Sequence, residues 1–176
     1  MQKREVARRV FAMEFNDSNL IFKEDADQYA PQYLLTPTGA KCNRLFVIGT
    51  LIEKENIGSD GTEYWRARVS DPTGAFILHA GQYQPEAAQM LAKIEPPCFV
   101  AVVGKPSAYK IESGETITSI RPEAIQVVEE PTRNIWVFDT AKQTVERMAS
   151  SKSDEGIKAR EHYNIESDHY KQMVQE

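Results

Sequence analysis

Alternating polar and apolar residues between positions 63 and 70 predict a strand with two unlike faces. One face would carry Tyr64, Arg66 and Arg68, and the opposite face would carry Trp65 and smaller apolar side chains suited to a core. Aromatic rings stack on bases and cations pair with phosphates, so the first face has the chemistry of a single-strand nucleic-acid site. A structural interpretation also fits these residues: the tyrosine covers one end of the fold and the arginines pair with nearby acids.

Five further residues extend this candidate surface along neighbouring elements. They are His79, Tyr83, Lys105, Tyr109 and Lys110. The first lies on the next predicted strand, the second in the loop after it, and the other three on the fourth predicted strand. We expect the eight side chains to form one nucleic-acid track.

No set of residues has the spacing of a catalytic or metal site. Ser167, Asp168 and His169 are consecutive, so they cannot converge on one reacting atom as the separated members of a triad do. Cys42 and Cys98 are far apart, without CxxC or Cys-His spacing, and the three histidines form no ligand pattern. The sequence also has no glycine-rich phosphate loop. We therefore expect no catalytic residues, no metal and no cofactor.

The charge balance limits how strongly such a surface can bind nucleic acid. The chain has 21 Lys and Arg against 26 Asp and Glu, for a formal net charge of −5. Residues 44–131 contain 8 basic and 12 acidic residues, a net charge of −4, whereas autonomous nucleic-acid binders are usually basic. Three or four cations on this background release few counterions. We expect the isolated chain to bind single strands weakly and to act mainly within an assembly.

Membrane and secretion patterns are missing from the sequence. The longest unbroken run of aliphatic and aromatic residues, 99–103, is far shorter than the ~20 residues needed to span a bilayer. The basic residues after Met1 are not followed by an apolar segment. We expect a cytoplasmic protein with no membrane partner.

The middle of the chain reads as a five-stranded barrel. The strand-forming segments are 44–52, 63–70, 75–80, 98–109 and 115–128, separated by turn residues. Pro85 starts an alanine-rich segment to Lys93 that predicts a helix between the third and fourth strands. This order of elements is that of an OB-fold barrel, which we expect over residues 44–131 of a mainly β protein.

The N-terminal part, residues 1–43, is predicted to form an amphipathic helix over 3–14 and an extended, irregular arm over 23–41. At the other end, residues 149–176 read as a flexible tail with a weak helix over 164–175.

A second helix is predicted over 132–148, with Thr132 as its cap. Its apolar residues recur at spacings of 3, 3, 4 and 3, which is the pattern of a seam with a partner helix. The stripe consists of Ile135, Phe138, Ala141, Val145 and Met148. The same stripe could instead pack on the chain's own barrel, and the isolated chain could also associate with itself through it.

Several short runs together carry a resemblance to a known family. They are 33–41 before the first strand, 70–74, 80–86, 103–106, 119–123 and the helix from Trp136 to Met148. In combination they resemble the archaeal replication protein A-associated proteins, which look like the middle subunit of eukaryotic replication protein A.

The resemblance implies a non-enzymatic subunit of a single-stranded DNA-binding complex, acting with a large replication protein A-like subunit in DNA replication, repair and recombination. The helix 132–148 corresponds in place to the one that joins the subunit bundle. The 28 residues from Ala149 are too few for the winged-helix domain of the eukaryotic protein. Two alternatives remain open: a protein-interaction module whose groove holds a peptide or the chain's own acidic segment 24–27, or an accessory subunit of an enzyme such as a nuclease.

Overall fold

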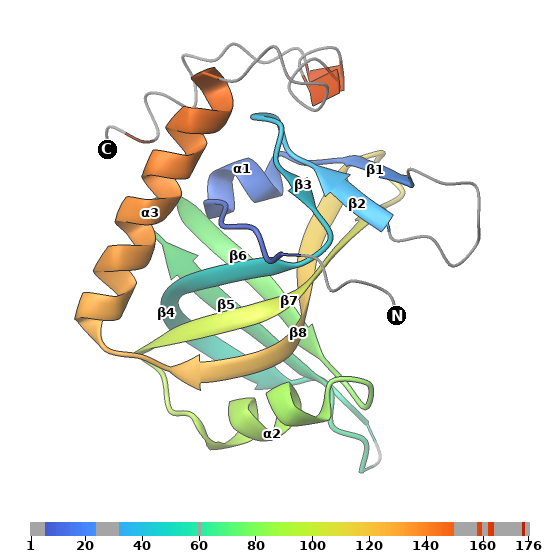
Figure 1. The fold of residues 1–176 in the computed structure, drawn as a ribbon. Helices are drawn as coiled ribbons and strands as arrows, with labels where there is room; N and C mark the ends of the chain where they lie inside the picture. The colour runs from blue at the N-terminus through green and yellow to red at the C-terminus, as the bar shows by residue number, and fades with distance from the viewer. Residues whose placement is uncertain are drawn as a thin grey trace, which may run out of the picture.

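The computed structural model describes residues 6–23, 32–59 and 61–149, together with the single residues 158, 159, 162, 163 and 174. Five strands close into a barrel in the order β4-β5-β6-β8-β7 (Figure 1). Their bounds are β4 Leu45–Asn56, β5 Trp65–Asp71, β6 Gly74–Ala80, β7 Cys98–Lys110 and β8 Thr116–Val127. Helix α2, Pro85–Lys93, connects β6 to β7 and covers one end of the barrel. The predicted OB-fold and its inserted helix are confirmed.

The barrel is held together by the alternation of side chains along each strand. On β5, Ala67 and Val69 are buried while Arg66 and Arg68 are exposed. Strand β6 follows the same rule, and its Leu78 lies opposite Ile120 of β8 in the parallel contact that closes the barrel. The interior is filled by apolar side chains, so Arg66 and Arg68 point outward. The one acid of the strand, Asp71, is buried at its end and accepts the N–H of Ala12 at 2.7 Å.

The predicted N-terminal helix is wrong over most of its length. Residues 6–11 are extended, because Arg8 donates its N–H to the carbonyl of Arg44 and accepts a bond from the N–H of Phe46. Helix α1 covers only Ala12–Asn16. The apolar residues that gave the helical pattern are buried against the barrel, so tertiary pairing with β4 outweighs a local amphipathic period. Residues 3–5 lie outside the described part.

The arm before the barrel is more regular than its sequence predicts. Strands β1 (Leu20–Lys23), β2 (Gln32–Leu35) and β3 (Lys41–Cys42) form a small antiparallel sheet, while residues 24–31 lie outside the described part. The turn from β2 to β3 uses Gly39 at φ 94°, a conformation that costs glycine little. Strands β2 and β3 are thus extended pieces of the predicted arm, and their pairing into a sheet with β1 is what the sequence does not predict.

Helix α3, Glu130–Ala149, lies along the outside of the barrel beside β4 (Figure 1). It begins two residues before the predicted start, and Thr132 lies within its first turn rather than at its cap. Trp136 is buried, donates its ring N–H to the carbonyl of Phe46 at 2.9 Å and packs edge-on against Phe11. None of the described helices is both long and apolar enough to cross a bilayer.

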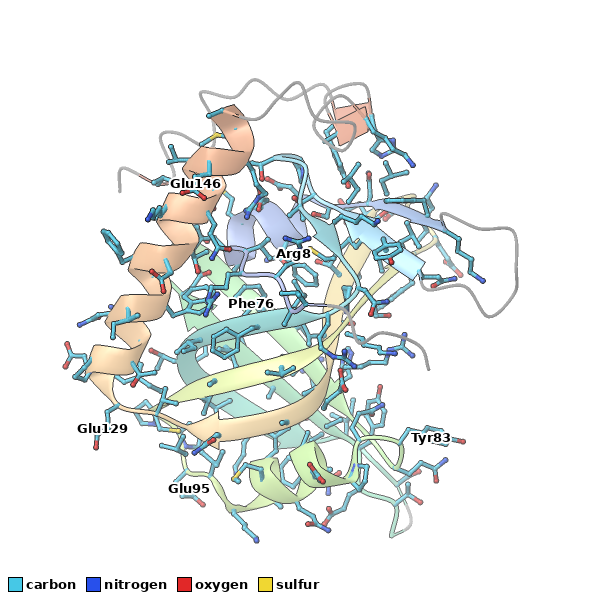
Figure 2. All side chains as sticks on the ribbon, viewed as in Figure 1. Arg8, Phe76, Tyr83, Glu95, Glu129 and Glu146 are labelled. Atoms are coloured by element: carbon cyan, nitrogen blue, oxygen red, sulfur yellow. The ribbon has the colours of Figure 1, made fainter. Side chains whose placement is uncertain are left out.

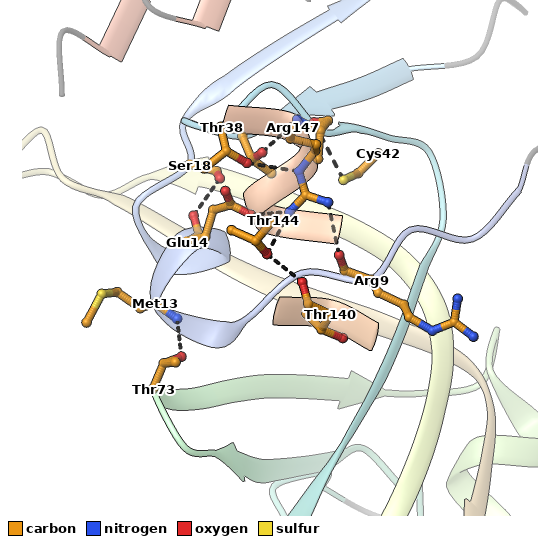
Figure 3. A network of polar contacts seen from close by, with 12 residues as sticks. Arg9, Met13, Glu14, Ser18, Thr38, Cys42, Thr73, Thr140, Thr144 and Arg147 are labelled. Atoms are coloured by element: carbon orange, nitrogen blue, oxygen red, sulfur yellow. Dashed lines mark hydrogen bonds and ion pairs between the residues drawn. The ribbon is translucent and has the colours of Figure 1, made fainter. Parts of the chain in front are cut away.

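The other end of α3 is held by a buried polar network (Figure 3). Arg147 pairs with the fully buried Glu14 of α1 at 3.0 Å and donates to the hydroxyl of Thr38 at 2.9 Å. A further guanidinium N–H reaches the carbonyl of Arg9 at 3.5 Å. Burial in the same region raises the pKa of the Cys42 thiol to about 12, so the thiol stays protonated. The helix is thus fixed near both ends.

Candidate nucleic-acid interface

The outer face of β5 carries two arginines that are paired with acids on β4. Arg66 lies opposite Glu55 at 3.1 Å, and Arg68 lies opposite Glu53 at 3.7 Å. About half of each arginine side chain remains exposed, 52% and 50%. Exposed ion pairs of this kind stabilise a fold by only about 0–1 kcal/mol. A phosphate can therefore replace either glutamate at small cost.

A bulge in β4 brings these acids to the outer face. The register shifts between Leu51 and Glu53, which leaves Ile52 as an extra residue. Without the shift, Glu53 and Glu55 would face the interior, because a one-residue slip moves every side chain to the other face. Pairing of the arginines with nearby acids is thus confirmed. The row on β4 that supplies these acids was not predicted, because the predicted strand ended at residue 52, four residues too early.

Tyr64 and His79 form a stacked aromatic pair beside the arginines. Their ring centroids are 5.9 Å apart with an interplanar angle of 29°. Gly81 permits this arrangement, since a Cβ there would lie 2.8 Å from the tyrosine ring. Burial, and then the nearby charge of Arg66, lower the pKa of His79 below its ordinary value. His79 is therefore neutral at pH 7 and offers a ring rather than a charge.

Two adjoining hollows run over this face. One, of about 400 Å³, is lined by residues 53–55 and 66–68 together with Ile77. The other, of about 380 Å³, shares Arg68 and Ile77 and continues to residues 116–118 of β8. We call the two together the β5–β6 groove. It combines cationic, acidic and apolar side chains on a surface open to an extended ligand. The Tyr64–His79 pair lies beside it, since His79 is the cross-strand partner of Arg66.

The hairpin between β7 and β8 borders the far end of the groove. Tyr109 lies directly opposite Ile117, which lines the groove, and Lys110 lies opposite Thr116. Cross-strand partners share a face of the sheet, so the ring of Tyr109 lies beside Ile117. The residue is 47% exposed. Six of the eight predicted residues therefore lie in or next to one groove.

The other two predicted residues lie elsewhere. Tyr83, in the loop before α2, and Lys105, on β7, line a separate hollow of about 490 Å³. Figure 2 shows Tyr83 pointing away from the barrel. Arg121 of β8 lines the same hollow and was not predicted, because only the β7–β8 register places it opposite Lys105. The eight predicted residues thus lie in two places on the barrel surface.

The predicted helix stripe is divided between two sides of α3. Ile135, Phe138 and Val145 are 62%, 69% and 47% exposed, whereas Ala141 and Met148 are partly buried against the core. The buried side of the helix is formed by Trp136, Thr140 and Thr144. Three large apolar side chains therefore remain on the outward side, where a partner can reach them.

Two solved structures share this fold. The chain is similar to one chain of a replication protein A heterotrimer bound to ssDNA, with a TM-score of 0.54, 14% identity and coverage of 81% of this chain and 98% of that chain. It is also similar to a chain of the S. pombe Stn1-Ten1 complex, with a TM-score of 0.54, 12% identity and coverage of 90% and 99%. No family model matches the chain, and a search of curated proteins finds no match.

These similarities establish the OB-fold. The barrel from Leu45 to Val127 makes up less than half of the chain, so coverage of 81–90% extends the likeness beyond the five strands. Among the residues that the structure describes, no three His, Cys, Asp or Glu side chains are grouped as metal ligands.

The environment of His79 predicts its titration. We expect its pKa to lie below the ordinary 6.5, and Arg66→Gln to raise it without restoring 6.5, because burial, the larger cause, remains. NMR of the ring protons across a pH series measures both values. Arg68→Gln, which removes the same charge opposite Ile77 instead, should leave the value nearly unchanged. A pKa of 6.5 or more in the wild-type chain contradicts this account.

Proposed function

We propose that this protein is a non-enzymatic OB-fold subunit of an archaeal replication protein A-like complex that binds single-stranded DNA in replication, repair and recombination. The observation that carries the proposal is the β5–β6 groove, whose two half-exposed arginines lie beside the stacked Tyr64–His79 pair. The groove residues in contact with DNA are Tyr64, Arg66, Arg68, His79, Tyr109 and Lys110.

Binding in this groove would exchange one set of anions for another. Phosphates displace Glu53 and Glu55 from the arginines, and because both pairs are exposed the exchange is nearly neutral in free energy. The net gain comes from bases that stack on Tyr64 and Tyr109, at about 1–3 kcal/mol per base. Three phosphate-binding cations, Arg66, Arg68 and Lys110, predict a shallow salt dependence, with log K falling by about 2 per unit of log salt.

The weak electrostatics make a partner subunit necessary. The acidic surroundings of the barrel repel a polyanion, so a large replication protein A-like subunit would supply most of the affinity. The outward residues Ile135, Phe138 and Val145 offer that subunit an apolar seam. The solved structures of similar fold are assemblies, one of them a heterotrimer bound to ssDNA, which supports this interpretation.

A second candidate function has one observation in its favour. Arg66 and Arg68 already bind carboxylates, those of Glu55 and Glu53. An acidic peptide from a partner would satisfy them in the same way, and the chain would then be a protein-interaction module without direct DNA contact. Such a module would bind the peptide and leave oligonucleotides unbound at low salt.

Charge substitutions in the groove should change DNA affinity in opposite directions. Arg66→Gln with Arg68→Gln should weaken binding of fluorescein-labelled oligo-dT roughly tenfold, or about 1.4 kcal/mol, because Glu53 and Glu55 are then left unpaired and repel the phosphates. Glu53→Gln with Glu55→Gln should tighten it, because no anion then has to be displaced. Fluorescence anisotropy at low and moderate salt measures both effects.

The matched control for the glutamates is Glu129→Gln with Glu146→Gln, which changes the net charge equally at two exposed positions near the ends of α3 (Figure 2). Equal effects of the two double variants would mean that only net charge matters. Nanomolar affinity of the wild-type monomer in moderate salt would contradict the need for a partner.

The seam on α3 should be required for assembly. Phe138→Glu places a charge on the most exposed of the three seam residues, and it should weaken co-purification with the large subunit of the same organism at least tenfold, since a buried phenylalanine is worth about 1.5–3 kcal/mol. The control is Val127→Glu at a 51% exposed position of β8, which should leave assembly intact. Light scattering of the isolated chain tests self-association through the same seam, and unchanged assembly of Phe138→Glu would contradict the proposal.

A further inference from the structure

Lys105 and Arg121 form a pair of like charges on the outside of the barrel, apart from the β5–β6 groove. They lie directly opposite each other on β7 and β8, and both are exposed. Like charges in this position destabilise a sheet. Among the residues that the structure describes, neither side chain forms an ion pair. The fold therefore carries an uncompensated repulsion that a bound anion would relieve.

The two cations line the 490 Å³ hollow at the start of α2, here called the α2 hollow. Tyr83, 84% exposed, lies at its edge and offers a free ring face. Of the two acids in the hollow, Glu123 accepts hydrogen bonds from Nε and Nη2 of Arg44 at 2.6 and 3.0 Å. That leaves Glu86 as the one lining carboxylate outside this pair, against two cations.

The two formal positive charges of the α2 hollow belong to Lys105 and Arg121, and the start of α2 adds one N–H fewer than most helices do. Pro85, the first residue of α2, has no N–H to offer. The side-chain oxygen of Gln84 accepts the N–H of Gly81 at 2.9 Å and so is already engaged. Anion binding in the hollow would thus depend mainly on Lys105 and Arg121, so substitution of these two residues tests it.

The α2 hollow follows the aromatic end of the groove along the chain. Tyr83 comes four residues after His79, a span of at most about 14 Å even when fully extended. Between them, Gly81 touches the ring of Tyr64. A single strand that passes over the Tyr64–His79 pair and continues in that direction reaches Tyr83 next.

We propose that the α2 hollow is a second contact for the sugar-phosphate backbone of the same single strand, with phosphates on Lys105 and Arg121 and a base stacked on Tyr83. The proposal rests on DNA binding in the β5–β6 groove and extends it. It makes Arg121 a binding residue and assigns this chain a longer footprint than the groove alone, within the 4–16 nucleotides that an OB-fold covers.

The test compares two lengths of oligo-dT, about 6 and about 16 nucleotides, on the full chain at low salt. Lys105→Gln with Arg121→Gln should weaken binding of the long oligonucleotide roughly tenfold and reduce its salt slope by about 1.4, and leave the short one unchanged. Glu86→Gln should tighten only the long one. Folding should be preserved, because the double variant removes opposed like charges at exposed positions; thermal melting checks this.

The matched control is Lys93→Gln with Lys142→Gln, which removes two charges at exposed positions on α2 and α3. If both double variants weaken the long oligonucleotide equally, or if the α2 variant weakens both lengths equally, the second contact is overturned while groove binding stands. If the wild-type chain binds neither length, the groove proposal and the second contact fail together. Loss confined to the long oligonucleotide supports the inference.

Discussion

Closure of the barrel is the constraint on which the other features of this molecule depend. Once β6 meets β8 at Leu78 and Ile120, the interior is sealed and filled, so Arg66 and Arg68 of β5 can only point outward. Strand β4 pairs with β7 through Leu51 and then continues beyond it, paired with β5 alone. The bulge at this point turns the acids of β4 to the same side as the arginines. The geometry of the barrel therefore places acids beside the arginines, and their charges cancel in the groove.

The same barrel fixes the orientation of α3. Trp136 anchors one part of the helix by its bond to β4, and Arg147 anchors the last turns through Glu14. One oxygen of Glu14 has no hydrogen-bond partner in the described part of the chain, so this carboxylate depends on Arg147. Removal of one member of such a buried pair typically costs about 3–5 kcal/mol. The rigid docking turns Phe138 and its neighbours outward, ready for a partner.

Sequence patterns predicted the features that depend on local periodicity. The helix Pro85–Lys93 and the five barrel strands were found because alternation and a helix-starting proline are visible within a few residues. The prediction of an N-terminal helix was wrong because the backbone of Arg8 forms hydrogen bonds with the start of β4. No local pattern in the sequence reveals such a tertiary contact. The sheet around β2 was not predicted for a similar reason, because its strands pair across a segment rich in turn residues.

The candidate site was predicted in its residue types but not in its grouping. The alternation of polar and apolar residues correctly predicted that Arg66 and Arg68 of β5 face outward. The acids opposite it depend on a bulge, and the pairing of Lys105 with Arg121 depends on a register across a hairpin. Likewise, heptad spacing on α3 did not distinguish the side that packs on the barrel, where Trp136 lies, from the side that faces solvent.

Photochemical crosslinking tests the central claim most directly, because it reports contact rather than affinity. An oligonucleotide that carries 5-iodouracil would be irradiated with the chain, and the crosslinked residues identified by mass spectrometry. The account predicts crosslinks at Tyr64, His79 and Tyr109, the rings next to the β5–β6 groove, of which the two tyrosines are exposed and His79 is partly buried. Crosslinks confined to α3 or to the β1–β3 sheet, or none at all from the assembled complex, would contradict it.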